Sequence, residues 1–395
     1  MKILHIITNL KPSDGGLPLA CLEYARILAD QGHQVSIYTT DLSDNGQRLP
    51  NKRNRNIYRD IQISYLSSGI FEKYPISFSL ARTIKKNVQK FDIVHVHGLY
   101  YFSTIAAAHY CSMFKVPYVI SIHGALDPYL RKRSKLRKFL FHKLFLDLVI
   151  NKADGVHYTT EIERAKAHAK LRYRSPSFVA GLGINLDDFE RLPPKGMFRM
   201  KYGVSMTVPI ILFLGRINFK KGLDLLVRSF RKILDIFPDV ILIIAGPEDP
   251  GYGIQVRKGL SENGILEKTI FTGLLLGDEK LAVFNDADIF VLPSQTENFG
   301  IAIAEAMACR LPVITTNQVN IWEKISSAKA GIIINCDSGE LTTALLELLD
   351  QPSKCKAYGS NGRKLVEEAF NWNRIGEKLS QEYNRILDKN RYTLL

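Results

Sequence analysis

Residues 293–312, PSQTENFGIAIAEAMACRLP, constrain the fold more than any other part of this chain. An apolar run, 289–292, precedes them and a second one, 313–316, follows them, and each run has the length of a buried strand. Residues 301–309 contain no Gly or Pro and favour a helix. Strand, loop, helix and strand in this order predict one repeat of a parallel α/β sheet.

Two acidic residues lie in this repeat, Glu297 in the loop after the first strand and Glu305 inside the helix. In open parallel sheets, ligands bind outside the carboxyl ends of the strands, and the backbone N–H groups of Asn298, Phe299 and Gly300 would point there. A carboxylate accepts two hydrogen bonds from a vicinal diol, so the pair indicates a hydroxyl-rich ligand.

A structural reading of the two glutamates stays open. Glu297 would then be a helix N-terminal acid favoured by the helix dipole, and Glu305 a solvated helix residue. Alanines flank Glu305 on both sides, and such small residues favour close packing over a wet helix face.

The Glu-x7-Glu spacing, with Asn-Phe-Gly after the first Glu, resembles the retaining glycosyltransferases of GT-B fold, group 1 (family 4). This resemblance implies an α/β protein of two Rossmann-like, doubly wound parallel-sheet domains that face each other across a cleft. It also implies that Glu297 contacts the donor sugar and that Glu305 holds the ribose hydroxyls of the nucleotide.

A pattern that is typical of phosphate binding lies earlier in the second half of the chain. An apolar run at 210–214 is followed by Gly-Arg-Ile-Asn-Phe-Lys-Lys-Gly at 215–222 and then by a predicted helix. Arg216 offers a planar fork and Lys221 a point charge, which together offset the two charges of a diphosphate. The pattern resembles the diphosphate-binding arginine and lysine of the family, which also places the nucleotide base near Leu274 and Leu275.

The first half of the chain begins with a predicted strand, 2–8, a Gly-rich loop and a helix, 19–31. Gly15 and Gly16 stand where the loop meets the helix, so a phosphate could approach the backbone without meeting a Cβ atom. The resemblance implies that Gly16 lies near the donor diphosphate and the acceptor.

His123 follows a predicted strand in the sequence SIHGALDPYL. The resemblance implies that this imidazole lies beside the anomeric centre of the donor sugar. HGxLDP is similar to a subgroup found in polysaccharide synthesis, which makes Asp127, Tyr129 and Arg131 candidate acceptor contacts. Asp127 can equally be an N-cap before Pro128.

Neither candidate metal pattern in the sequence predicts a metal site. His95, His97 and His123 lie at strand ends, but their spacing is not compact and no carboxylate or thiolate stands near them in the sequence. Asp286-Ala-Asp288 precedes a strand, at the wrong end of a parallel sheet, and is expected to cap a short helix. Arg310 stands where the family usually has Gly, at an expected left-handed position.

A length of 395 residues predicts two domains of about 180 to 200 residues each. We expect an acceptor-side domain at 1–190, a linker at 191–201, a donor-binding domain at 202–372 and a last helix at 373–390 that returns to the first domain. The apolar runs are strand-sized, and the first residues have no signal-type cleavage site, so we expect a cytoplasmic protein with reduced cysteines.

The net charge of +14 indicates an acidic partner: a nucleotide diphosphate sugar, an anionic membrane surface or nucleic acid. Residues 131–138, RKRSKLRK, carry six positive charges and run into an apolar segment, which is typical of a membrane-surface or acceptor-binding element. A solvated face followed by an ordinary core helix is the alternative. No base-stacking aromatics interleave with these charges, which argues against nucleic acid.

The function expected from the resemblance is a retaining, metal-independent hexosyltransferase without a cofactor. UDP-glucose is the first expected donor, and a growing glycan or a lipid-linked oligosaccharide is the expected acceptor. The expected catalytic set is His123, Arg216, Lys221 and Glu297, with Glu297 positioning the sugar instead of attacking it. A nucleotide-sugar epimerase or hydrolase, or a non-catalytic basic membrane- or nucleic-acid-binding protein, remains an alternative.

Overall fold

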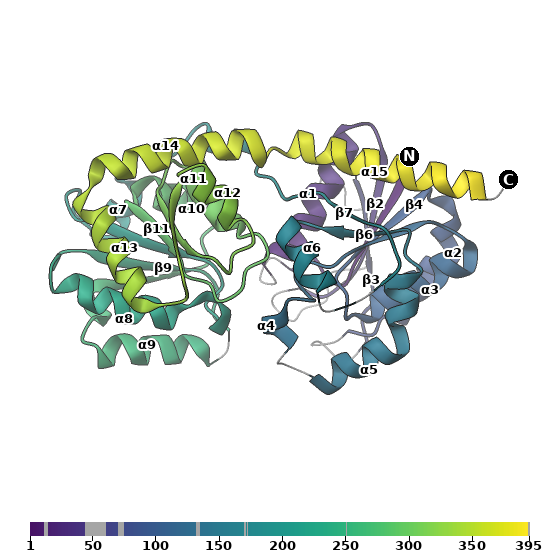
Figure 1. The fold of residues 1–395 in the computed structure, drawn as a ribbon, viewed down its shortest axis with the longest axis horizontal. Helices are drawn as coiled ribbons and strands as arrows, with labels where there is room; N and C mark the ends of the chain where they lie inside the picture. Colours follow the sequence, from purple (N-terminus) through teal and green to yellow (C-terminus); the bar gives the residue numbers. More distant parts are fainter. Residues whose placement is uncertain are drawn as a thin grey trace. The chain divides into compact units, whose positions relative to one another are not determined.

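The chain forms two compact units, Met1–Leu182 with Trp372–Leu395, and Gly183–Asn371 (Figure 1). The computed structural model describes residues 1–11, 15–43, 61–69, 75–131, 135–169, 171, 173–249 and 251–393. Each unit is built on one parallel sheet with helices packed against it. The prediction of two doubly wound α/β domains is therefore confirmed.

The first unit contains a seven-stranded sheet in the order β3-β2-β1-β4-β5-β6-β7. Its strands are β1 (Lys2–Ile7), β2 (Gln34–Thr40), β3 (Ile61–Leu66), β4 (Ile93–His97), β5 (Tyr118–Ser121), β6 (Gly155–Tyr158) and β7 (Ser177–Val179). Its helices include α1 (Gly16–Asp30), α2 (Phe78–Asn87), α3 (Phe102–Phe114), α4 (Pro128–Arg131), α5 (Lys135–Leu146), α6 (Glu161–His168) and α15 (Trp372–Thr393). Strand β4 is buried at all five positions, as expected for a sheet covered on both faces.

The second unit contains a six-stranded sheet in the order β10-β9-β8-β11-β12-β13. Its strands are β8 (Ile210–Leu214), β9 (Ile241–Ala245), β10 (Thr269–Gly273), β11 (Ile289–Leu292), β12 (Val313–Thr316) and β13 (Gly331–Ile334). Its α-helices are α7 (Met197–Tyr202), α8 (Leu223–Leu234), α9 (Tyr252–Glu262), α10 (Gly277–Asp286), α11 (Ile301–Ala308), α12 (Trp322–Ser327), α13 (Ser338–Asp350) and α14 (Pro352–Ala369) among the described residues.

Both sheets reverse their strand order once, between β1 and β4 in the first unit and between β8 and β11 in the second. At such a reversal the loops that follow the two central strands diverge and leave a crevice at the carboxyl edge. In the second unit these loops are 215–222, after β8, and 293–300, after β11. The two motifs singled out in the sequence therefore meet at one switch point.

The predicted linker at 191–201 is wrong, because the boundary lies earlier and this segment packs onto the second sheet. The Asp286 carboxylate accepts hydrogen bonds from the backbone N–H groups of Gly196 (2.5 Å) and Phe198 (2.8 Å), which caps the start of α7. The buried guanidinium of Arg199 donates to Asp288 at 3.0 Å. Asp286 thus caps a short helix, as expected, whereas Asp288 caps none and instead accepts hydrogen bonds from the Arg199 guanidinium and from the Ile210 N–H at the start of β8.

The last helix, α15, belongs to the first unit, and it is slightly longer than the predicted range of 373–390. Its Trp372 ring packs edge-on against Tyr24 of α1, and its buried Tyr383 hydroxyl hydrogen-bonds His95 of β4 at 2.5 Å. Within the described residues, none of the helices combines the length and apolar character that crossing a membrane requires.

Loops 215–222 and 293–300 are in direct contact. Gly222 has a φ of 67°, and a Cβ atom on it would lie 2.0 Å from the carbonyl oxygen of Pro293. The backbone N–H of Gln295 donates to the carbonyl of Lys220 at 2.7 Å. Only glycine permits this approach, because any side chain at position 222 would have to push the Pro293 backbone away.

Gly222→Ala therefore destabilises the second unit more than Gly203→Ala does. Gly203 has the same φ of 67° but open space where its Cβ would stand, so its substitution costs only the left-handed strain of about 1–2 kcal/mol. We expect the Gly222 variant to lose at least about 1 kcal/mol more, because the overlap with Pro293 adds to that strain. Urea unfolding of both variants measures the difference, and equal midpoints would contradict the loop contact.

Candidate active site

The carboxyl edge of the second sheet brings Lys221 and Glu297 together as an ion pair. Lys221 lies near the end of the loop after β8, and Glu297 lies in the loop after β11. The backbone of Glu297 is itself held in place: its N–H donates to the Gln318 carbonyl at 3.2 Å, and its carbonyl accepts from the Asn320 N–H at 3.0 Å. Both side chains are mostly buried but reach solvent.

Three cationic side chains gather at this edge. Arg216 lies 3.7 Å from the Asp249 carboxylate, and Gly246 packs so closely that a Cβ there would lie 2.1 Å from the Gly215 carbonyl. The pKa of Lys220 is lowered, mainly because the side chain is buried. The negative charge of Glu297 acts in the opposite direction, and the positive charges of Lys221 and Arg216 lower this pKa further. Lys220 was not predicted from the sequence, although it stands in the same Phe-Lys-Lys-Gly run.

The start of α11 supplies the backbone expected at a ligand site. Gly300 has a φ of 80° and forms the N-cap of this helix, where a Cβ would press within 3.0 Å of Ile303. The Phe299 ring is buried against Phe370, so only its backbone can face a ligand. The Asn298 side chain accepts a hydrogen bond from the Asn320 amide at 3.3 Å.

Glu305 is 8% exposed, and its carboxylate accepts a hydrogen bond from the Lys280 ammonium at 2.6 Å. The solvated-face alternative for this residue is therefore wrong. Burial, with the nearby negative charge of Glu305, raises the pKa of the Cys309 thiol to about 12. Lys280, on α10, is a partner that the sequence analysis missed.

Leu274 follows β10 at the same edge of the sheet, after Gly273, which has a φ of 70°. Its side chain is exposed, whereas that of Leu275 is buried. Arg310, at the other end of α11, adopts a φ of 60°, so its expected left-handed conformation is confirmed.

In the first unit, a buried carboxylate holds the turn that contains His123. His123 and Gly124 both adopt left-handed backbone angles, with φ of 49° and 74°. Glu163 of α6 accepts hydrogen bonds from the Gly124 N–H at 2.5 Å, and from the N–H and hydroxyl of Thr159 at 2.8 and 3.0 Å. A left-handed histidine is strained, so this carboxylate offsets a local cost. Glu163 was not predicted from the sequence, because Gly124, which it holds, is distant from it along the chain.

The His123 ring contacts a second histidine. Its Nε2 lies 3.2 Å from Nδ1 of His97, whose Nε2 in turn lies 2.9 Å from Nδ1 of His5. Burial, followed by the charge of His157, lowers the pKa of both His5 and His123 to about 3. Burial also lowers the pKa of His97. All three imidazoles are therefore neutral at physiological pH.

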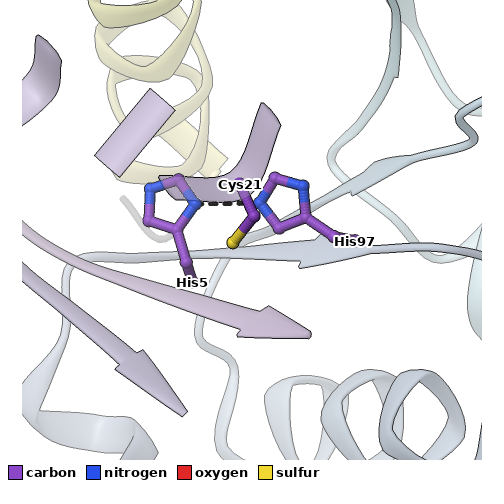
Figure 2. Close-up of side chains that lie close together, drawn as sticks. All are labelled: His5, Cys21 and His97. Atoms are coloured by element: carbon purple, nitrogen blue, oxygen red, sulfur yellow. Dashed lines mark hydrogen bonds between the residues drawn. The ribbon is translucent and has the colours of Figure 1, made fainter. Parts of the chain in front are cut away.

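One group of residues in the first unit could hold a metal ion. Figure 2 shows His5 and His97 with Cys21, and one nitrogen or sulfur of each lies within 4.8 Å of the others. Of the three histidines considered in the sequence, only His97 belongs to this group, and its thiol neighbour Cys21 is distant from it along the chain. Two observations favour a hydrogen-bonded pair over metal ligands: the imidazoles already bond each other, and burial raises the pKa of Cys21, which keeps the thiol protonated.

The other residues predicted from the first unit have separate positions. Gly16 is exposed and begins α1, while residues 12–14 of the preceding loop lie outside the described residues. Asp127 accepts a hydrogen bond from the Tyr129 N–H at 2.8 Å and lies 3.4 Å from the Lys166 ammonium, so it caps α4. The Arg131 side chain and those of 132–138 lie outside the described part of the chain.

Two sequence families match this chain. Residues 14–188 match the family described as Glycosyltransferase Family 4, and residues 196–365 match Glycosyl transferases group 1. An uncharacterised glycosyltransferase of Methanocaldococcus jannaschii is 27% identical and aligns over 97% of this chain and 98% of its own length. A GDP-mannose:cellobiosyl-diphosphopolyprenol alpha-mannosyltransferase of Xanthomonas campestris is 24% identical over 98% and 97% of the two chains.

Among solved structures, HepE of Anabaena in complex with UDP-glucose superposes with a TM-score of 0.81. The superposition covers 98% of this chain and all of that one, at 17% identity, and so shows the fold alone. Two doubly wound sheets with this strand order define the GT-B class of protein. Within that class, the chain belongs to the group 1 glycosyltransferases, family 4.

Glu163→Gln is expected to destabilise the first unit by about 1–3 kcal/mol, because the amide nitrogen cannot accept one of the backbone N–H bonds and leaves it unpaired. Glu161→Gln on the same helix is the matched control, since Glu161 is solvent-exposed and forms a surface ion pair with Arg164, so its loss should cost less than about 1 kcal/mol. Chemical unfolding measures both. Equal losses would contradict the role of Glu163 in holding the turn.

Proposed function

We propose that this protein is a retaining, metal-independent hexosyltransferase. It moves a hexose from a nucleotide diphosphate sugar to a growing glycan or a lipid-linked oligosaccharide. The observation that carries the proposal is the cationic edge of the second sheet, where Arg216, Lys220 and Lys221 lie beside Glu297. Cations at the carboxyl edge of a doubly wound sheet suit a ligand with two phosphates.

The reaction builds negative charge on the departing diphosphate. Arg216 can donate hydrogen bonds to two phosphate oxygens in one plane, and Lys221 adds a point charge held in place by Glu297. These side chains provide the charge that a divalent metal supplies in other phosphate-transfer sites, which is why we propose a reaction without metal.

Glu297 is assigned to positioning. Its carboxylate is engaged by the Lys221 ammonium, and its backbone is fixed at both N–H and carbonyl, so it has neither the freedom nor the electron density of a strong nucleophile. In the proposed reaction the carboxylate orients the donor sugar. The leaving phosphate takes the proton of the incoming hydroxyl on the same face, which retains the anomeric configuration.

Glu305 is assigned to the ribose hydroxyls. Its carboxylate is positioned by the Lys280 ammonium, and a carboxylate can accept two hydrogen bonds from a diol. Leu274 follows β10 at the edge proposed for the base, and Gly16 and His123 are assigned to the donor from the first unit.

UDP-glucose is the first donor proposed, and the similarity of fold to HepE in complex with UDP-glucose supports testing it first. The Xanthomonas relative is named for GDP-mannose, so GDP-mannose is the second donor to test. That relative is also named for a diphosphopolyprenol-linked oligosaccharide, and this supports a lipid-linked acceptor. The HGALDP sequence, with Asp127, Tyr129 and Arg131, is the segment we assign to the acceptor in polysaccharide synthesis.

A lipid-linked acceptor requires the enzyme to reach a membrane surface. Phe139 and Leu144 of α5 are 63% and 64% exposed, and they follow the six positive charges of 131–138 in the sequence. Exposed apolar side chains beside basic ones are typical of a helix that lies on an anionic bilayer. We therefore propose peripheral binding to the inner face of the plasma membrane through α5.

Thermal shift with UDP, GDP and ADP sugars tests the donor site. A true donor stabilises the folded protein by about 2.7 kcal/mol at a concentration of 100 Kd. Arg216→Ala and Lys221→Ala are expected to remove most of this stabilisation, because both side chains offset the charge of the bound diphosphate, and to lower turnover at least about a hundredfold, because more negative charge forms there in the transition state. Arg228→Ala, on the exposed face of α8, is the control and should behave like the unmodified protein.

Two outcomes would contradict the proposal. Normal turnover of either variant would refute the phosphate assignment. Nucleotide release that does not depend on added acceptor would favour an epimerase or a hydrolase of the same architecture.

Phe139→Ser with Leu144→Ser is expected to weaken binding to anionic phosphatidylglycerol vesicles at least about tenfold, because two apolar side chains no longer enter the interface. Phe78→Ser is the matched control, since Phe78 is 67% exposed in the same unit but lies on α2. Vesicle co-sedimentation measures both. Equal binding of the double variant and the control variant would contradict membrane contact through α5.

A further inference from the structure

Three histidines of the first unit form a hydrogen-bonded row that runs from the interior of the sheet to the His123 turn. His5 lies on β1 and His97 at the end of β4, and both are completely buried. Figure 2 shows the hydrogen bond between their rings. His97 then bonds His123 through its other nitrogen, at 3.2 Å.

The direction of these hydrogen bonds follows from simple counting. A neutral imidazole has one N–H donor and one bare nitrogen acceptor. If His97 uses one nitrogen for each neighbour, the donors must all point the same way, either from His5 toward His123 or from His123 toward His5. The two directions give His123 opposite tautomers.

The outer nitrogen of His5 decides between them. This Nε2 is buried and has no hydrogen-bond partner among the described residues. If the donors ran toward His5, this nitrogen would carry a buried N–H without an acceptor, which proteins rarely tolerate. If they run toward His123, the same nitrogen is bare, which is the less costly defect. The donors therefore run from His5 through His97 to His123.

The same reasoning assigns every donor and acceptor in a second row of hydrogen bonds in this unit. The Nε2 of His157 lies 2.8 Å from the Ala180 carbonyl, which can only accept, so His157 carries its hydrogen there. Its Nδ1 then accepts from Ser121, Ser121 accepts from His95, and His95 accepts from Tyr383, at 2.6, 2.6 and 2.5 Å. This row ends on backbone and does not reach His123.

We propose that His5 and His97 are positioning residues that fix His123 in the tautomer with its hydrogen on Nδ1. The Nε2 of His123 accepts from His97, so Nδ1 is left as a donor, and no described group occupies it. Glu163 holds the backbone of the turn through Gly124, which fixes the position of the His123 ring. The hydrogen bond from His97 fixes which ring nitrogen of His123 carries the hydrogen. A neutral N–H of this kind can donate to the oxygen of a hydroxyl, which is the ligand group that we assign to it.

The inference rests on the proposed function only in taking that hydroxyl to belong to the donor sugar. The tautomer itself is a property of the ligand-free protein. It can therefore be measured whether or not the protein transfers a hexose.

The direct test is nitrogen NMR of the whole protein labelled with 15N-histidine. We expect the His123 signals of a neutral ring with the hydrogen on Nδ1, and signals of the opposite tautomer for His157. In His97→Leu, the His123 ring loses its donor and should shift toward a mixture of tautomers. In His97→Asn, the amide nitrogen replaces Nδ1 of the imidazole and should preserve the original signals.

Kinetics provide a second readout. His97→Leu is expected to lower kcat a few-fold, in proportion to the fraction of molecules whose His123 ring no longer carries its hydrogen on Nδ1, while the affinity for the free nucleotide stays unchanged. His97→Asn should recover most of this loss. Ser121→Ala, which interrupts only the second row, is the control and should change kcat less than about twofold.

Three results would overturn the proposal. The first is a hydrogen on Nε2 of His123 in the unmodified protein. The second is equal kcat for the Leu and Asn variants of His97. The third is one equivalent of tightly bound metal that Cys21→Ser removes, since a metal would occupy the ring nitrogens that face each other (Figure 2). If no nucleotide sugar binds, the proposed function fails, and the NMR result still decides the tautomer.

Discussion

The contact between Gly222 and the Pro293 carbonyl is the constraint on which the site in the second unit depends. Because the two backbones touch, the loop that ends in Lys221 and the loop that carries Glu297 cannot move independently. The ion pair between these side chains then links two segments that are 76 residues apart in the sequence. An ion pair that reaches solvent contributes little stability by itself, so its value here is orientation. The contact between Gly222 and Pro293 fixes the two loops, and this keeps Lys221 and Glu297 in place relative to each other.

The parts of the site that the sequence predicted are those where chemistry and local structure coincide. The strand, loop and helix around Glu297 are encoded by neighbouring residues, as is the loop that contains Arg216 and Lys221. Pattern and propensity are sufficient there, since each motif lies within one repeat of the sheet. For the same reason the left-handed Arg310 could be predicted, because it follows from the end of a single helix.

The parts that the sequence did not predict depend on partners that are distant in the chain. Glu163 holds Gly124 across 39 residues, and Asp286 caps a helix that begins near Gly196, 90 residues earlier. The predicted linker failed for this reason: a Pro-rich segment has the composition of a connection, and only the distant aspartate reveals that it is packed. Cys21 likewise comes beside His97 through the packing of a helix on a sheet, which spacing along the chain does not encode.

The two sheets present different electrostatic environments at their carboxyl edges. The second has cations paired with carboxylates, and the first has imidazoles that burial keeps neutral. In the proposed reaction the diphosphate gains negative charge while the anomeric carbon becomes positive. A protonated histidine beside that carbon would oppose the reaction, whereas a neutral donor can bind a sugar hydroxyl without adding charge. Burial lowers the pKa of His123 and of the two histidines in the row behind it, so in the proposed reaction the His123 ring stays neutral and contributes a hydrogen bond without a charge.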